Sequence, residues 1–270
     1  MSSPSRFPAF IVHYSPLIER AHYLKKVLSV SNLEINWITE NDYKDFPSEF
    51  RVEGKIVGVT ENLVGMDLGI NSRSLKFSRR RARLQGLVLL IRSKISGRKS
   101  LINGSLPRKE PLGVAQIEIQ RMHMTALSKG LEIDLNWILV LEDDAVPVEV
   151  AFDELNELLT NLSAKNTWVN LNSGAGLNRT NSEKKLNRLG LFRVRPASTR
   201  CVVAYLVSKD LAKKMVDSAL KDGIPDWLPI DFYYQVLLRK FKAKSYWADP
   251  AIFEQGSENG RYLSNLERFR

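Results

Sequence analysis

Three acidic residues follow a run of apolar residues in the stretch LVLEDDAVP, residues 139–147. Because side chains alternate between the two faces of an extended strand, Glu142 and Asp144 are expected on one side and Asp143 on the other. Two carboxylates on one side, at the end of a buried strand, suit a hard divalent cation such as Mg²⁺ or Mn²⁺. The alternative is a solvated acidic turn before the next helix, and the triplet alone leaves both interpretations open.

The residues before the triplet, 137–141, form a continuous apolar run. Its length and its β-branched residues predict a buried central strand with parallel neighbours. The first forty residues show an apolar run at 10–12, a helical period over 17–30 and a second apolar run at 35–38. This strand–helix–strand order favours an α/β fold, in which ligands bind at the carboxyl ends of the strands.

Apolar periodicity predicts further elements in the second half of the chain. The expected helices are 113–130, 151–162, 209–222 and 229–241, and the expected strands are 168–171, 202–207 and 245–247. Gly130 is a stop signal for the first of these helices, and Ser208 is an N-cap for the third. Residues 178–190 are polar and basic, which favours a loop. We therefore predict a single α/β domain over residues 1–270, with a mostly parallel central sheet flanked by helices.

The composition, with 44% hydrophobic and 26% charged residues, is that of an ordinary globular protein. The one cysteine, Cys201, allows no disulfide within the chain, and a reducing compartment fits. The first ten residues have no apolar signal core, and no apolar run approaches the roughly 20 residues of a membrane-spanning helix. We expect a cytoplasmic protein.

The net charge of +10 is concentrated in one segment of the chain. Between Leu68 and Lys109 there are twelve basic residues and no acidic one, which predicts a basic helical insertion at about 68–109. Such a segment could lie on the inner face of an anionic membrane, bind nucleic acid through phosphates, or be a solvated face. Because Phe77 is its one aromatic residue, base stacking is disfavoured, and we expect no nucleic-acid partner.

The order of five stretches resembles glycosyltransferase family 25, the lipopolysaccharide-biosynthesis type. They are FIVHYSPLIERAHYLKKVL, WILVLEDDAVP, VVAYLVSKDLAKKMVD, LPIDFYYQVLL and DPAIFEQGS. The resemblance covers residues 8–40 and 110–257. It implies a GT-A-like fold and an inverting, galactosyltransferase-like transfer of a hexose from a nucleotide sugar, with a UDP-sugar as the expected donor. The acceptor would be a hydroxyl of a glycan or of a lipopolysaccharide-type molecule.

The resemblance also assigns roles to residues, beginning with a metal motif at the acidic triplet and Mn²⁺ or Mg²⁺ as cofactor. Asp144 would bind the metal, and Glu142 or Asp143 would hold a metal-bound water or the ribose. The residues where the turn after the first strand would meet the donor are Tyr14, Ser15 and Arg20. The alternative for Arg20, besides a contact with the diphosphate, is a surface salt bridge.

Asp231 follows a Pro-x pattern at the start of a predicted helix. It could bind the acceptor or serve as the catalytic base, because inverting transfer needs a base within hydrogen-bond reach of the attacking hydroxyl. Its alternative role is a helix N-cap. His123 matches a histidine that the family carries before the acidic motif, with a purely structural role as the alternative. The weaker candidates for contacts with the acceptor or sugar are Ser173, Glu254 and Gln255.

Two departures from the family pattern define the alternative function. His13-Tyr14-Ser15 replaces an Asn-Leu-Asp-type turn, and Met122-His123 lacks a preceding Gly-Cys. The alternative is a degenerate, non-catalytic member that binds a glycan or an anionic surface. A third hypothesis, a nucleotidyltransferase, would need a glycine-rich turn near the first strand, and residues 13–20 contain no glycine. The absence of a Gly-x-Ser-x-Gly elbow argues against the usual hydrolase.

Overall fold

The computed structural model describes residues 6–39, 114–173, 185–186, 190–194, 197, 199, 201–225, 228–257 and 259–262. The predicted basic insertion at 68–109 lies outside these residues. So does most of the predicted loop at 178–190, and the described part of it contains a short strand, β6 (Lys185–Leu186), that the polar sequence did not predict. Within the described ranges, no helix is long and apolar enough to cross a membrane.

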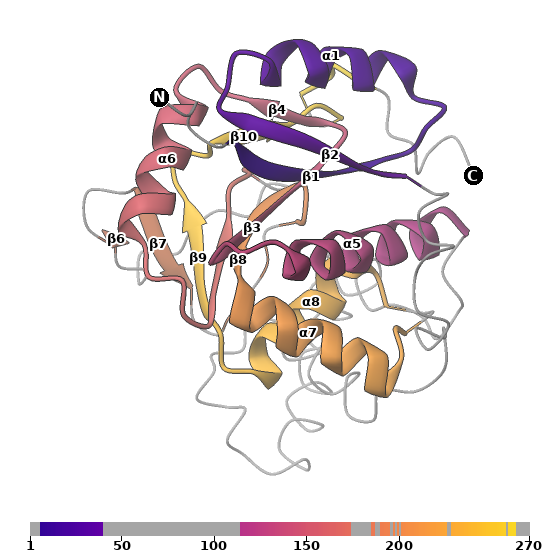
Figure 1. Ribbon diagram of the computed structural model, residues 1–270, viewed down its shortest axis with the longest axis vertical. Helices are drawn as coiled ribbons and strands as arrows, with labels where there is room; N and C mark the ends of the chain where they lie inside the picture. The colour runs from indigo at the N-terminus through magenta and orange to yellow at the C-terminus, as the bar shows by residue number, and fades with distance from the viewer. Residues whose placement is uncertain are drawn as a thin grey trace, which may run out of the picture.

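An eight-stranded sheet forms the centre of the fold, in the order β2-β1-β3-β8-β5-β9-β7-β6 (Figure 1). Its other strands are β1 (Phe7–His13), β2 (Leu33–Thr39), β3 (Trp137–Glu142), β5 (Thr167–Asn170), β7 (Leu191–Val194), β8 (Ala204–Ser208) and β9 (Lys244–Ala248). Six strands run in one direction, and β8 and β7 run against them. The predicted α/β class is therefore confirmed, and the sheet is mixed because β8 introduces antiparallel pairs at its centre.

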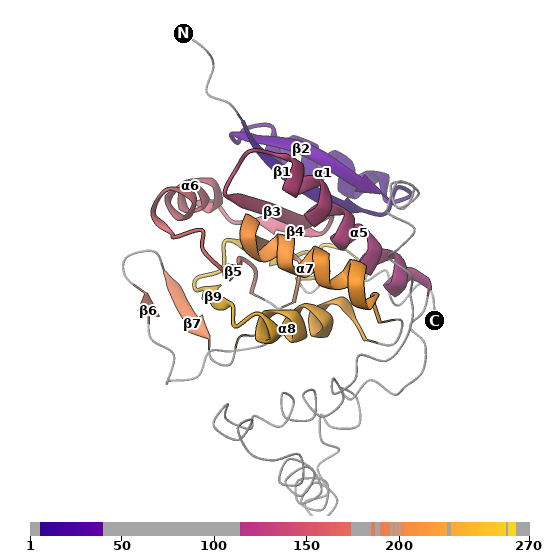
Figure 2. The same ribbon diagram turned by 60° about the horizontal axis from the view of Figure 1, so that its bottom comes forward.

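Helices cover both faces of this sheet (Figures 1 and 2). The helices on one face are α1 (Ile18–Leu28) and α6 (Ala151–Asn161), and those on the other are α5 (Val114–Glu132), α7 (Lys209–Asp222) and α8 (Ile230–Lys240). In β3, Val140 faces the core beneath α5, α7 and α8, and Leu139 and Leu141 face the opposite core. A strand that is apolar on both faces must lie between two layers of helices, which is what the run at 137–141 predicts.

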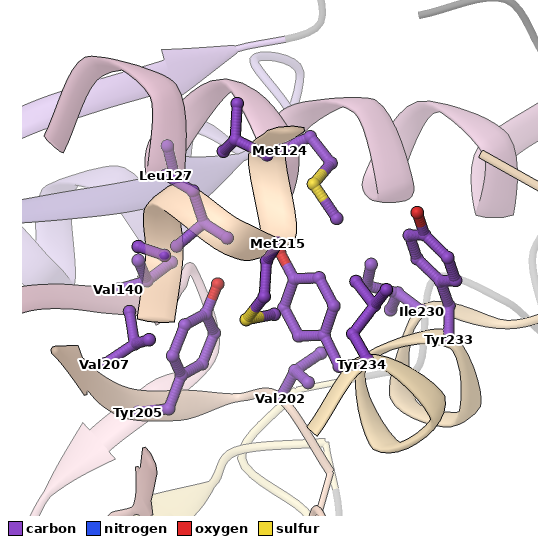
Figure 3. Packing of buried hydrophobic residues seen from close by; sticks show 14 of the residues in the cluster. Met124, Leu127, Val140, Val202, Tyr205, Val207, Met215, Ile230, Tyr233 and Tyr234 are labelled. Atoms are coloured by element: carbon purple, nitrogen blue, oxygen red, sulfur yellow. The ribbon is translucent and has the colours of Figure 1, made fainter. Parts of the chain in front are cut away.

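The core beneath α5, α7 and α8 joins distant parts of the chain (Figure 3). Met124 and Leu127 of α5 point toward Met215 of α7, and Tyr205 of β8 lies beside Tyr234 of α8 with ring centroids 5.9 Å apart. All five side chains are buried. This packing fixes α5, α8 and β8 relative to one another.

The prediction that Gly130 ends its helix is wrong, because α5 continues to Glu132. A Cβ at Gly130 would lie 2.6 Å from Cγ2 of Ile138, so the glycine serves the close approach of α5 to β3. The prediction for α7 is confirmed in position, since the helix begins after Ser208 and ends before Gly223. However, the Ser208 hydroxyl donates to Oδ1 of Asp210 at 2.7 Å and makes no cap hydrogen bond to the backbone.

Five strands, β1, β2, β3, β5 and β9, end at the same edge of the sheet. A second, two-stranded sheet lies next to this edge and was not predicted: β4 (Ala145–Pro147) pairs with β10 (Phe253–Gln255). Its register places Gln255 opposite Ala145, the residue that follows the acidic triplet. The fold therefore brings residues 253–262 back against the carboxyl end of β3.

Candidate active site

The acidic triplet lies where β3 ends and turns into β4. Glu142 is the last residue of β3, and Asp143 and Asp144 form the turn, both of them almost fully buried. The three side chains make different contacts. Asp143 contacts β1 and α1, Glu142 contacts α5, and Asp144 contacts the segment after β10.

Asp143 is held by three donors from the beginning of the chain. Its Oδ1 accepts a hydrogen bond from Nη1 of Arg20 at 2.7 Å, and its Oδ2 accepts from the backbone N–H of Tyr14 at 3.2 Å and lies 2.9 Å from Nδ1 of His13. The Arg20 side chain is 7% exposed and the ring of Tyr262 covers it, with the guanidinium carbon 4.9 Å from the ring centroid. Asp143 thus ties the acidic turn to β1 and α1, on the side away from Glu142, as strand alternation predicts.

The predicted donor-binding residues fall into two groups. Arg20 is buried in the ion pair with Asp143, rather than in the surface salt bridge considered as its alternative, so its Nη1 is engaged within the protein. Tyr14 and Ser15 are exposed at the turn after β1, and the Tyr14 backbone contributes its N–H to Asp143. The turn that would face a donor is therefore anchored by the same carboxylate that binds Arg20.

Glu142 belongs to a hydrogen-bonded network with His123 and Tyr205. Nε2 of His123 lies 3.1 Å from Oε1 of Glu142, and Nδ1 lies 3.1 Å from the Tyr205 hydroxyl. Burial lowers the pKa of His123 to about 4, so the ring is neutral at pH 7 and has one donor and one acceptor nitrogen. With Glu142 ionised, Nε2–H donates to the carboxylate and Nδ1 accepts from the Tyr205 hydroxyl.

Asp231 is the second residue of α8, and Pro229 holds the N-cap position. The N-cap alternative for Asp231 is therefore wrong. Its carboxylate accepts the backbone N–H of Val202, while its Oδ1 is buried with no hydrogen-bond partner among the described residues. Burial, followed by the charge of Glu142, raises the pKa of Asp231 to about 6, with the nearby His123 opposing the shift. The charges of Glu142 and His123 therefore both act on the pKa of Asp231.

Asp144 is 5% exposed, and its two carboxylate oxygens have different surroundings. Oδ2 accepts a hydrogen bond from the Ser257 hydroxyl at 2.7 Å, while Oδ1 is buried without a partner in the described part of the chain. Burial raises the pKa of Asp144, against the hydrogen bond from Ser257 and the charge of Arg20. Burial also raises the pKa of Glu142 well above its usual range, helped first by the charge of Asp144.

The three weaker candidates lie around this site with unequal connections to it. Gln255 donates from Nε2 to the Ser257 hydroxyl at 3.0 Å and so reaches Asp144 through one intermediate. Glu254 is exposed and accepts a hydrogen bond from Asn259. Ser173 is half-buried after β5, and within the described residues it forms no hydrogen bond to the acidic triplet.

The site has features that fit a divalent cation. Two buried carboxylate oxygens, Oδ1 of Asp144 and Oδ1 of Asp231, have no partner among the described residues, and burial, with the charges of neighbouring carboxylates after it, raises the pKa values of Glu142 and Asp231. In the described ranges, no group of three or more His, Cys, Asp or Glu side chains could hold a metal ion. A magnesium ion that works with phosphates commonly takes one or two carboxylates from the protein and its other ligands from substrate and water. Asp144, with Glu142 beside it, fits that kind of site.

Three contributing residues were missed by sequence reasoning: His13, Tyr205 and Ser257. His13 stands directly after an apolar strand, at the same sheet edge as the triplet, and that position could have identified it. Tyr205 lies within the apolar run of β8, where it resembles an ordinary core residue. Ser257 lies in the stretch DPAIFEQGS, but its contact with Asp144 spans 113 residues and depends on the pairing of β4 with β10.

Comparisons of the chain with protein-family models and with curated proteins give no match.

Proposed function

We propose that this chain is a metal-dependent, inverting glycosyltransferase with a GT-A-like fold, similar to glycosyltransferase family 25. It would transfer a hexose, with galactose as the first candidate, from a UDP-sugar to a hydroxyl of a glycan or lipopolysaccharide-type acceptor. One observation carries the proposal: Glu142 and Asp144 of the acidic triplet, Asp231 and His123, which come from three separate stretches of the chain, are electrostatically or hydrogen-bond coupled near the carboxyl end of β3.

The location of these residues supports a ligand site. Five strands end at this edge, and ligands of α/β sheets bind outside the carboxyl ends of strands. The buried carboxylates also lower the stability of the folded state, because burying like charges near one another is unfavourable. Such clusters are typical of functional sites. The third carboxylate of the triplet, Asp143, forms a buried ion pair with Arg20, whereas Glu142, Asp144 and Asp231 have no ion pair with an arginine or lysine in the described residues.

Within this proposal the carboxylates have different roles. Asp144 would hold a Mn²⁺ or Mg²⁺ ion through Oδ1, with Glu142 beside it, and such an ion supplies charge neutralisation for the diphosphate of the donor. Asp231 would accept the proton of the attacking hydroxyl, because its Oδ1 is unpartnered and its raised pKa lies near neutral pH. His123, neutral and fixed between Tyr205 and Glu142, would orient the Glu142 carboxylate.

The proposal is tested by the thermal stability of the wild-type chain with a panel of UDP- and GDP-sugars, each with and without Mn²⁺. A donor at 100 times its dissociation constant stabilises the folded state by about 2.7 kcal/mol. For a chain of this length that raises the melting temperature by about 5–10 °C. We expect one donor to give such a shift only with Mn²⁺, and Asp144→Asn to abolish it.

Asp217→Asn is the matched control, because it makes the same chemical change at an exposed ion pair with Lys213 on α7. It should keep the full donor shift. An equal shift in Asp144→Asn would show that Asp144 does not hold the metal. If no donor shifts the wild type and the chain binds anionic vesicles instead, the non-catalytic alternative takes the place of the proposal.

A further inference from the structure

The segment after β10 contacts Asp144 of the acidic turn and Arg20, the ion-pair partner of Asp143. The backbone N–H of Gly256 donates to the carbonyl of Asp144 at 2.8 Å, and the Ser257 hydroxyl donates to its carboxylate. The backbone N–H of Tyr262 then donates to the carbonyl of Gly256 at 2.9 Å, and the Tyr262 ring lies over Arg20, the partner of Asp143. Residues 255–257 and 259–262 are called the C-terminal strap below.

Gly256 shows how closely the strap approaches the turn. A Cβ at this position would lie 2.5 Å from Cδ2 of Tyr262 and 3.1 Å from the carbonyl oxygen of Asp144. A side chain here would therefore push Tyr262 or the turn aside, so glycine allows Ser257 to reach Asp144. The backbone hydrogen bond from Gly256 to Asp144 and the missing Cβ at Gly256 therefore bring the Ser257 hydroxyl close to the Asp144 carboxylate.

The direction of the hydrogen bonds in the strap is fixed by chemistry. The amide Nε2 of Gln255 can only donate, so the Ser257 oxygen accepts from it. The hydroxyl proton of Ser257 is then available for Asp144, whose Oδ2 accepts it at 2.7 Å. This chain occupies Oδ2 of Asp144 and leaves Oδ1, which is buried and has no partner among the described residues.

We propose that Ser257 is a positioning residue, oriented by Gln255, that fixes the carboxylate of Asp144 so that Oδ1 alone is presented to a divalent cation. This inference rests on the proposed metal site and adds the residues that prepare it. Groups that orient a metal ligand affect metal affinity almost as strongly as some ligands do, commonly by about 10–100-fold. Ser257 and Gln255 would therefore act without touching the cation.

The test is a titration of the full-length protein with Mn²⁺ alone, followed by water-proton relaxation, for the wild type and four variants. We expect Ser257→Ala to weaken Mn²⁺ binding by about 10–100-fold, while Ser257→Thr keeps the hydroxyl and binds as the wild type does. Gln255→Glu should weaken binding at least as much as Ser257→Ala, because a carboxylate would accept the Ser257 proton and compete with Asp144 for it. A role in structure alone would lower the melting temperature of Ser257→Ala and leave its Mn²⁺ affinity unchanged.

Ser218→Ala is the matched control, because its hydroxyl also donates to an aspartate, Asp222, but at the C-terminal end of α7. It should leave Mn²⁺ affinity unchanged. Affinity within twofold of the wild type in Ser257→Ala would overturn the inference and leave the metal site itself standing. No binding of Mn²⁺ by the wild type would overturn both. The melting temperature of each variant, measured alongside, establishes that a weakly binding variant is folded.

Discussion

Asp143 and Asp144 are chemically identical neighbours with opposite surroundings. Asp143 meets a guanidinium, a histidine ring and a backbone N–H, so both of its oxygens are satisfied. Asp144 has one satisfied oxygen and one buried oxygen without a partner in the described residues, and burial raises its pKa although the charge of Arg20 opposes the shift. One side of the turn is built for stability, and the other keeps an unfavourable charge that a cation would compensate.

This difference shows why the acidic residues of a motif should not be given one shared role. Consecutive residues of a turn can meet different elements, so the fold can satisfy one carboxylate fully and leave the next one with an unpaired oxygen. The variants below change one side at a time and measure whether stability and metal binding respond separately.

The largest effect on stability is expected from Asp143→Asn. This change leaves the buried guanidinium of Arg20 without its charged partner, and removing one member of a buried ion pair costs about 3–5 kcal/mol. Urea denaturation at pH 7 should show a loss of this size. A loss below about 1 kcal/mol would mean that the pair behaves as an exposed one, and the contrast between the two sides of the turn would then fail.

Sequence patterns predict many of the strands and helices that position the acidic turn. The apolar run at 137–141 indicates a central buried strand, and alternation places Asp143 opposite Glu142, because both follow from local backbone geometry. The helix signal at Gly130 fails because a tertiary contact with Ile138 decides the role of that residue. The three-residue strands β4 and β10 were missed, since so short a run carries no detectable period.

The partners of the acidic residues could be predicted less well than the residues themselves. For Arg20 the sequence left open a contact with the diphosphate or a surface salt bridge, and the structure buries it in an ion pair with Asp143, 123 residues away. Ser257 gave no chemical signal, because a serine becomes a positioning residue only through what folding places beside it. Sequence thus indicates which side chains can do chemistry, and tertiary packing decides which of them are left unsatisfied.

A smaller effect of opposite sign is expected from Asp231→Asn. Asp231 has a pKa of about 6 in the folded state and an ordinary value of 3.8, so the folded chain binds this proton more tightly than the unfolded chain does. The charged carboxyl therefore lowers stability at pH 7, and this loss vanishes as the pH falls below about 4. The variant should be more stable than the wild type by about 1–3 kcal/mol at pH 7, with the difference near zero at pH 4.

Urea denaturation of both proteins at pH 4, 5.5 and 7 measures this difference directly. Comparison at each pH also removes most of the contribution of His123, whose low pKa acts in the opposite direction. If the variant is instead less stable than the wild type at pH 7, the charged Asp231 carboxylate stabilises the folded state, as that of Asp143 does.

The smallest effect is expected from Tyr262→Leu, which removes the ring over Arg20 and keeps the backbone bond from Tyr262 to Gly256. A cation–π contact of this kind contributes about 0.5–2 kcal/mol, so stability should fall by about 1 kcal/mol while Mn²⁺ affinity stays unchanged. Tyr262→Phe is the control, because it keeps the ring over Arg20 and removes only the hydroxyl. Weaker Mn²⁺ binding in the leucine variant would show that the ion pair of Asp143 also sets the position of Asp144, and that the two sides of the turn are coupled.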